Sequence, residues 1–374
     1  MVEKMPSVTE REVLAALSKV QDPELMRDLV SLGMIKDVKV DGGRVAVTVE
    51  LTTPACPLKN KIRADVEAAL RAVPGVEEVG IEMAGRVRPA AKEAPAIPGV
   101  KHVVLVGAGK GGVGKSTCAV NIALALKRSG ASVGLLDADF YGPSIPLMLG
   151  LEGRPTPTED GKGIVPLEKH GIKAISIGLF IDPHQAMIWR GPMLHGALIQ
   201  MLREVTWGEL DYLVVDLPPG TGDVPLSVSQ TIQASGAVLV TTPQDVSLAD
   251  VTKAKLMFDK IKIPVLGLVE NMSNFICPHC QTATPIFDTG GGRRAAEQMD
   301  IPFLGEIPLD LAVRVGGDEG KPIVTAHPES PQAEAFMTMA RNIAGQVSRV
   351  AHGEKSEPEP KPAAGHQCSG CGGC

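Results

Sequence analysis

Aromatic side chains are scarce in this 374-residue chain: Phe, Tyr and Trp make up 3% of it, while hydrophobic residues together make up 44%. The core must therefore be built largely from aliphatic side chains. The chain also lacks an excess of basic residues, because 37 Lys and Arg stand against 43 Asp and Glu. This mildly acidic balance gives no general electrostatic footprint for nucleic acid, so we expect no nucleic-acid partner.

Long apolar runs are missing as well. The first residues up to Pro6 lack the apolar core of a secretory signal, and no later stretch approaches the roughly 18 apolar residues of a membrane helix. We therefore expect a cytoplasmic protein without membrane contact. In a reducing compartment, the odd number of seven cysteines argues against a disulfide framework.

The chain is too long for one ordinary domain, and its patterns predict two folded parts. Residues 1-88 form a small α+β domain in this prediction. A capping box at Thr9 and Glu12 begins a helix, strands are expected over 35–40, 44–51 and 76–83, and a second helix over 58–73. Residues 89-99 hold three prolines without periodicity and are predicted to be a linker.

Residues 100-352 alternate short apolar runs with helical or loop stretches. The runs lie at 102–106, 132–136, 212–215, 237–241 and 265–269. This alternation predicts an α/β domain with a mostly parallel sheet and helices on both faces. Residues 353-374 are rich in Glu, Pro and Lys and are predicted to be a disordered tail, which ends in Cys368-x-x-Cys371-x-x-Cys374.

A glycine-rich motif follows the first of these strands. The segment from Gly109 to Ser116 matches G-x-x-x-x-G-K-[ST] between an apolar strand and a helix-forming stretch. Its backbone amides can hold phosphates at the helix N-terminus, Lys115 can reach the terminal phosphates, and Ser116 can bind Mg²⁺. The predicted nucleotide-binding residues here are Gly109, Lys110, Gly111, Gly112, Val113, Gly114, Lys115, Ser116 and Thr117.

Aspartates follow two later strands: Asp137 and Asp139 after one, Asp216 after another. Open α/β sheets place their ligands at this end of the strands, although an aspartate there can also cap a helix or form a turn. Lys110 is a second lysine inside the glycine-rich loop. Its charge would stabilise phosphoryl oxygens during transfer, unless it is only a solvated loop residue.

The loop Gly-Lys-Gly-Gly-Val-Gly-Lys-Ser, with Lys110, resembles the deviant Walker A motif of the MinD, ParA and nitrogenase iron-protein ATPases. The resemblance implies that Lys110 and Lys115 act on the phosphates, with Lys110 reaching across a dimer. It also implies that Asp139 orients or activates the attacking water and that Asp216 holds Mg²⁺ through its shell. Asn271 would contact the adenine, and Pro308-Leu-Asp310 resembles a later loop that lines the base.

Paired cysteines follow Asn271-Met-Ser in the sequence Cys277-Pro-His-Cys280. Two thiolates on one turn can share a metal, but they cannot complete a tetrahedral site or a four-thiolate cluster. A two-fold dimer could supply the other two ligands. Zinc favours the same spacing, so a structural zinc site remains an alternative.

Further motifs narrow the resemblance to the Mrp/ApbC iron–sulfur carrier ATPases, over about residues 100 to 350. They are the P-loop, Asp-Ala-Asp-Phe-Tyr-Gly-Pro-Ser from Asp137, Trp189-Arg-Gly-Pro-Met, Asp-Leu-Pro-Pro-Gly-Thr-Gly-Asp from Asp216, and Cys-Pro-His-Cys. The resemblance implies a homodimer with ATP and Mg²⁺, a 4Fe-4S cluster on Cys277 and Cys280, a cluster donor and apo-protein clients. ATP hydrolysis would be slow and coupled to the client. A MinD- or ParA-like switch with a structural zinc is the alternative.

The N-terminal part resembles a small module of iron–sulfur assembly factors through Asp22-Pro-Glu24 and Thr52-Thr-Pro-Ala-Cys56-Pro. The resemblance makes Cys56 a candidate relay ligand, whereas a lone cysteine is commonly a small buried hydrophobe. The tail cysteines Cys368, Cys371 and Cys374 could hold a cluster, receive one in transit, bind zinc or be inert.

Overall fold

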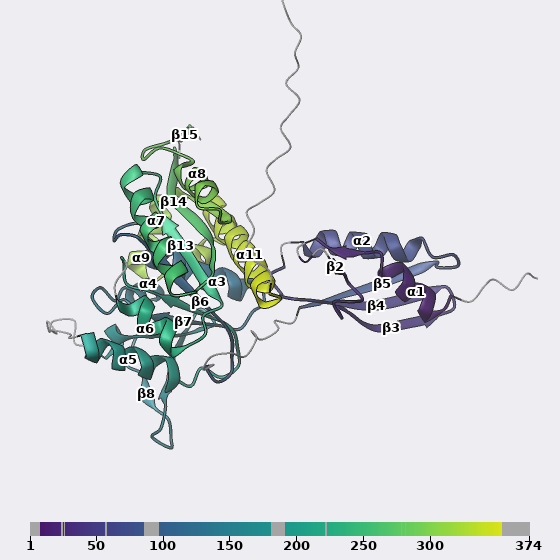
Figure 1. The fold of residues 1–374 in the computed structure, drawn as a ribbon, viewed down its shortest axis with the longest axis horizontal. Coiled ribbons are helices and arrows are strands. Elements are labelled where there is room, and N and C mark those ends of the chain that lie inside the picture. The colour runs from purple at the N-terminus through teal and green to yellow at the C-terminus, as the bar shows by residue number, and fades with distance from the viewer. Residues whose placement is uncertain are drawn as a thin grey trace, which may run out of the picture.

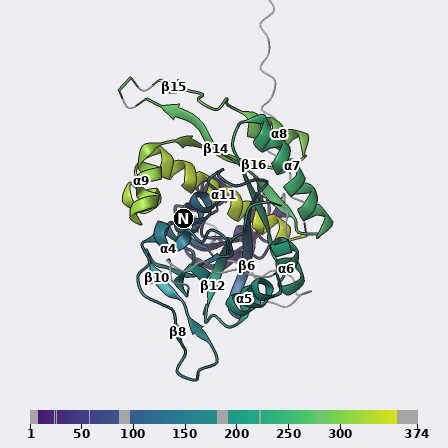
Figure 2. The ribbon, with the colours of Figure 1, turned by 90° about the vertical axis from the view of Figure 1, so that its left-hand side faces the viewer.

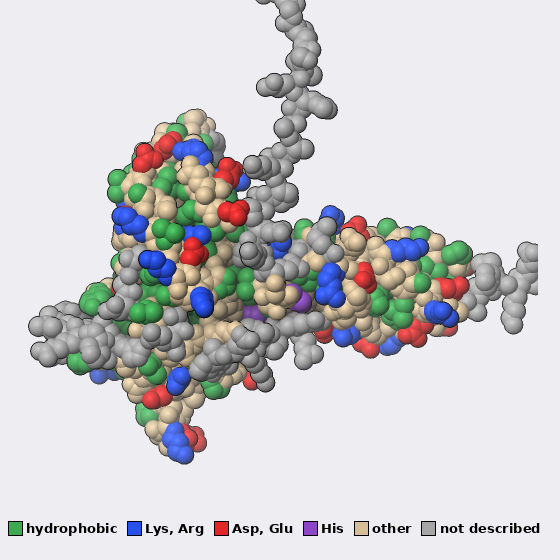
Figure 3. All heavy atoms as spheres, in the orientation of Figure 1, with side chains coloured by type: hydrophobic (Ala, Val, Ile, Leu, Met, Phe, Trp, Pro, Cys, Tyr) green, Lys and Arg blue, Asp and Glu red, His purple; other side chains and the backbone are tan. Residues whose placement is uncertain are grey.

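The computed structural model describes residues 8–23, 25, 27–56, 58–85, 97–180, 191–220, 223–277, 279–280 and 282–353, which form a small unit and a large one (Figure 1). Most of the predicted linker 89-99 and the predicted tail beyond Gly353 lie outside these residues. On the face drawn in Figure 3, basic and acidic side chains are interspersed over both units.

The small unit packs two helices on a three-stranded sheet. β4 alternates buried and partly exposed residues, so that Val45, Val47 and Val49 face the core, where α2 contributes Ile62 and Val66. The capping box is present, because Thr9 and Glu12 bond each other's backbone amides. The elements are α1 Glu10–Leu17, β1 Gln21–Asp22, β2 Arg27–Asp28, β3 Ile35–Asp41, β4 Arg44–Leu51, α2 Lys59–Arg71 and β5 Glu78–Gly85.

The large unit is built on a nine-stranded sheet in the order β10-β11-β7-β12-β6-β13-β14-β15, with β16 also paired to β14. Seven strands run parallel to one another: β11, β7, β12, β6, β13, β14 and β16. The strands β10 and β15 run antiparallel at the margins. The strands are β6 Val100–Ala108, β7 Val133–Asp137, β8 Thr156–Pro157, β9 Ile164–Val165, β10 Leu167–Lys169, β11 Ile172–Ser176, β12 Leu210–Asp216, β13 Gly236–Thr241, β14 Val265–Ile276, β15 Ala283–Thr284 and β16 Phe303–Leu309.

Helices cover both faces of this sheet (Figures 1 and 2). One aliphatic core lies under α3, α10 and α11, and a second lies under α5, α7 and α8. The helices are α3 Lys115–Arg128, α4 Ile145–Leu149, α5 Gly191–Arg203, α6 Asp223–Thr231, α7 Asp245–Lys260, α8 Gly291–Gln298, α9 Leu311–Glu319, α10 Ile323–Ala326 and α11 Pro331–Ala351, with a short 3₁₀ helix Ile177–Leu179. The predicted fold class is confirmed.

One strand is much longer than its apolar run. The sequence predicts a strand over 265–269, but β14 continues to Ile276. The apolar run ends at Glu270, and the polar residues Asn271, Ser273 and Asn274 follow, yet backbone pairing with β16 and β15 carries the strand onward. The far end of β14 and β15 stand away from the body of the unit (Figure 2). Within the described part of the chain, no helix is long and apolar enough to cross a membrane.

Candidate functional site

The P-loop lies between β6 and α3. Gly112 and Gly114 both have φ of +81°, a left-handed conformation that side chains rarely adopt. A Cβ on Gly114 would also lie 2.2 Å from Nδ2 of Asn271. The loop therefore bends sharply into the N-terminus of α3, where Lys115 and Ser116 begin the helix and Cys118 is buried in its first turn. A helix N-terminus of this kind favours phosphate binding.

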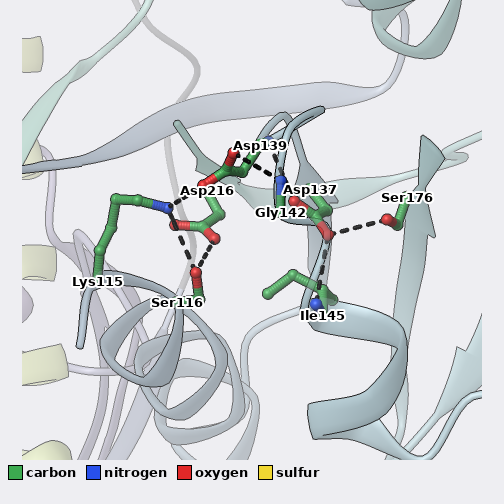
Figure 4. A network of polar contacts seen from close by, with 8 residues as sticks. All are labelled: Lys115, Ser116, Asp137, Asp139, Gly142, Ile145, Ser176 and Asp216. Atoms are coloured by element: carbon green, nitrogen blue, oxygen red, sulfur yellow. Dashed lines mark hydrogen bonds and ion pairs between the residues drawn. The ribbon is translucent and has the colours of Figure 1, made fainter. Parts of the chain in front are cut away.

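Asp216 joins the two residues that begin α3. Its Oδ1 accepts a hydrogen bond from Nζ of Lys115 at 2.7 Å, and its Oδ2 accepts one from Oγ of Ser116 at 2.5 Å (Figure 4). The Asp216 side chain is fully buried, and that burial raises its pKa, while the Lys115 ammonium acts in the opposite direction. The three side chains form a compact set of cationic and oxygen groups at the carboxyl end of β12.

The two aspartates after β7 have different surroundings. Asp139 Oδ2 lies 3.6 Å from Nζ of Lys115, so this carboxylate faces the P-loop. Asp137 instead accepts hydrogen bonds from the backbone amides of Asp139 and Ile145 and from the Ser176 hydroxyl. Burial, and then the nearby Asp216 carboxylate, raise the pKa of Asp137 to about 7. Asp137 therefore holds the loop that presents Asp139.

Three other predicted residues lie in different places: Lys110 on the P-loop, Asn271 against it, and Asp310 at the start of α9. Lys110 is half-buried on the loop, and within the described residues it makes no ion pair. Asn271 donates from Nδ2 to the carbonyl oxygen of Val113 at 2.9 Å, so it supports the loop from β14. Asp310 caps α9 by accepting from the Ala312 amide at 2.7 Å. Gly109, Gly111 and Thr117 complete the loop and the first turn of α3.

Cys277 and Cys280 lie at the tip of a hairpin formed by β14 and β15, here called the cysteine hairpin and comprising residues 274–289. The Cys277 amide donates to the carbonyl oxygen of Thr282 at 3.1 Å, which closes the tip. Cys277 is half-buried and Cys280 exposed. Hydrogen bonds with Thr282 and then with Cys277 lower the pKa of the Cys280 thiol, which favours the thiolate that binds metals.

This hairpin offers a pair of ligands but not a complete metal site. Among the described residues, no group of three or more His, Cys, Asp or Glu side chains could hold a metal ion. The remaining ligands for a tetrahedral ion or a cluster must therefore come from another molecule or from residues outside the described ones. Cys368, Cys371 and Cys374 lie outside them.

The other two described cysteines are buried. Cys118 is fully enclosed in α3, where burial raises the pKa of its thiol. Cys56 is 7% exposed and belongs to the core of the small unit, while Ala55, one residue earlier, packs into the core of the large unit. Beside them, the hydroxyl groups of Thr53 and Tyr212 lie 3.0 Å apart. The loop that carries Cys56 is thus held between the two units.

Sequence patterns missed several residues of this site. Ser176 and Tyr212 lie in strands with ordinary apolar patterns, and only the fold places them beside Asp137 and Thr53. Glu270 was missed in the same way, although a carboxylate that directly follows an apolar run and is buried needs hydrogen-bond partners.

A P-loop that begins a helix beside a mostly parallel sheet, with Asp216 and Asp139 at the strand ends, defines a P-loop NTPase. The chain belongs to the NUBPL iron-transfer P-loop NTPase family, whose model matches residues 99–344. Residues 10–83 match the iron-sulfur cluster assembly protein family. The resemblance predicted from the motifs is confirmed.

Individual relatives agree with this assignment. The iron-sulfur cluster carrier protein of Deinococcus radiodurans is 57% identical over 90% of this chain and 95% of its own length. The iron-sulfur cluster transfer protein NUBPL of Dictyostelium discoideum is 49% identical over 71% of this chain and 83% of its own. A nucleotide-binding protein from Archaeoglobus fulgidus, solved in complex with ADP, is 40% identical with a TM-score of 0.55, covering 63% of this chain and 92% of that one.

Proposed function

We propose that this protein is an ATP-dependent carrier that holds a 4Fe-4S cluster between two copies of the chain and transfers it to apo-proteins. The observation that carries the proposal is the thiol pair Cys277 and Cys280, on a hairpin that continues the strand beside the P-loop. The similarity to relatives named as iron-sulfur cluster carrier and transfer proteins supports the nature of the cargo.

The number of ligands on each chain supports a homodimer. A 4Fe-4S cluster is commonly held by four thiolates, and each hairpin supplies two. A two-fold axis would bring two hairpins together and so complete the set. The exposure of Cys280 and the lowered pKa of its thiol leave a thiolate accessible to a cluster donor and to the apo-protein that receives the cargo.

The chemistry of the P-loop residues fits Mg²⁺ and ATP. Ser116 and Asp216 offer the hard oxygen ligands that Mg²⁺ prefers. Bound Mg²⁺ would neutralise negative charge on the phosphate oxygens. Lys115 would exchange its carboxylate partners for phosphate, Lys110 would reach phosphates across the dimer, and Asn271 would contact the adenine.

We propose that Asp139 takes part in a slow hydrolysis. This carboxylate would orient the attacking water, but it is engaged by Lys115 at 3.6 Å. It becomes available when Lys115 turns toward phosphate. We propose that a client or a cluster donor completes this change by favouring one dimer state, which couples hydrolysis to transfer.

The test is anaerobic reconstitution, with iron, sulfide and zinc assayed per chain and the oligomeric state measured. The variants are Cys277→Ser/Cys280→Ser, a chain that ends before Cys368, and Cys118→Ala as a control that also removes a thiol. We expect only the paired-cysteine variant to lose iron, sulfide and the cluster-dependent dimer. Transfer to an apo-protein is then followed with ATP and with ADP.

Two outcomes would oppose the proposal. Zinc in place of iron and sulfide would support a structural zinc in a MinD- or ParA-like switch. Iron lost only from the shortened chain would move the cluster from the hairpin to the tail cysteines.

A further inference from the structure

Glu270 is a buried carboxylate in the middle of β14. Glu270 has no exposed surface, and it directly follows the apolar residues Leu268 and Val269. Burying a charge is costly unless hydrogen bonds compensate it. Its conformation is therefore tied to the groups that provide those bonds.

The compensating groups lie at the start of α8. Oε1 of Glu270 accepts from the Gly290 amide at 3.2 Å, and Oε2 accepts from the Gly292 amide. The N-terminus of a helix favours negative charge, and amide hydrogen bonds to a carboxylate are stronger than neutral ones. A Cβ on Gly292 would lie 2.9 Å from Oε2. Glycine at this position therefore lets the carboxylate reach the helix.

These contacts join the two ends of the cysteine hairpin. β14 runs on from Glu270 into the hairpin, and the chain comes back from the hairpin at Gly290, where α8 begins. Above this junction, Nδ2 of Asn274 donates to the Thr289 hydroxyl at 3.3 Å, and Phe275 pairs with Thr284. The hairpin is thus a connected strand pair, and one carboxylate fastens its base to α8.

The neighbouring residue connects the same strand to the nucleotide loop. Asn271 donates to the carbonyl oxygen of Val113 and lies directly against Gly114. Successive residues of a strand point to opposite faces, so Glu270 and Asn271 hold α8 and the P-loop from the two sides of β14. The P-loop at Val113 and the strand that carries the hairpin are therefore in direct contact.

We propose that Glu270 is a positioning residue that, together with Asn271, couples the state of the P-loop to the orientation of the cysteine hairpin. That the hairpin carries a cluster rests on the proposed function, whereas the coupling between the P-loop and the hairpin does not. Loss of the carboxylate would leave Asn271 in contact with the P-loop but release the return end of the hairpin at Gly290.

The experiment measures maleimide labelling rates of Cys277 and Cys280 in full-length chains without nucleotide, with Mg-ADP and with a slowly hydrolysed ATP analogue. The tail cysteines are replaced by Ser throughout. In the parent chain we expect nucleotide to change the rate by at least about five-fold, the effect of one hydrogen bond on an opening equilibrium. In Glu270→Gln, the side-chain NH₂ must face one of the two backbone N–H groups, so one hydrogen bond is lost. We expect the change of labelling rate with nucleotide to fall below about two-fold in this variant, with nucleotide affinity retained.

Glu306→Gln is the matched control, because Glu306 is exposed on the neighbouring strand at the position paired with Glu270. In Glu306→Gln, the labelling rate should depend on nucleotide as it does in the parent chain. Equal labelling of the parent chain in all nucleotide states would overturn the coupling, as would full dependence in Glu270→Gln or its loss in Glu306→Gln.

A second measurement covers the case in which Glu270→Gln does not fold. Hydrogen exchange in the parent chain should show the Gly290, Gly292 and Cys277 amides changing together when nucleotide binds. Separate responses would contradict the coupling. Neither measurement needs a cluster. If the chain binds no iron but its labelling depends on nucleotide, the proposed cluster is refuted and the coupling stands.

Discussion

The cysteine hairpin and the junction between the two units place thiols in opposite surroundings. Cys280 is exposed at the tip of the hairpin, where hydrogen bonds lower the pKa of its thiol. Cys56 is buried in a loop between two hydrophobic cores. The hairpin can present a ligand to another molecule without unfolding, whereas Cys56 can do so only if the loop that carries it leaves the core of the small unit. Cysteine spacing alone does not reveal this difference.

The largest expected effect is the difference in thiol reactivity between the hairpin and the core. Cys118 can react only when its part of the core opens, and core openings in native proteins commonly cost several kcal/mol. We expect Cys280 to react with maleimide at least about 1000-fold faster than Cys118 at neutral pH, because such openings are rare. Peptide mass spectrometry of partly labelled protein measures both rates. Comparable rates would show that α3 opens readily.

A smaller effect is expected at the junction. Tyr212→Phe removes the hydroxyl that lies 3.0 Å from Oγ1 of Thr53, but keeps the ring stacked on His102. A hydrogen bond contributes about 1 kcal/mol, so labelling of Cys56 should rise about five-fold. Thr53→Ser keeps a hydroxyl and should leave the rate near that of the parent chain. An unchanged rate in Tyr212→Phe would mean that packing of Ala55 alone closes the junction.

The smallest effect concerns the pKa of Cys280. The hydrogen bond with Thr282 is the main reason that the pKa of Cys280 is lowered. Thr282→Val should therefore raise the pKa of this thiol toward its ordinary value. A higher pKa leaves less thiolate at neutral pH, and labelling should slow about two- to three-fold. The midpoint of the pH–rate curve should move to higher pH. Thr284→Val, an exposed change in β15, is the control, and an equal shift there would point to a general change in the hairpin.

Local patterns were sufficient for much of the fold. The helix predicted over 58–73 is α2, and the five apolar runs of the large unit are β6, β7, β12, β13 and β14. These elements follow from apolar periodicity within a few residues. The strands β11 and β16 were missed, and the polar end of β14 was not predicted, because its pairing partners β15 and β16 lie farther along the chain.

The sequence by itself determined the P-loop, the paired cysteines and the α/β class, because each depends on residue types at short, fixed spacing. The tertiary structure decided which side chains meet. Lys115 and Asp216 are 101 residues apart, and Thr53 and Tyr212 are 159 apart. Strand order, and not local spacing, brings such residues together. For the same reason only the fold reveals that Cys56 is enclosed and that Glu270 fastens the hairpin bearing Cys277 and Cys280.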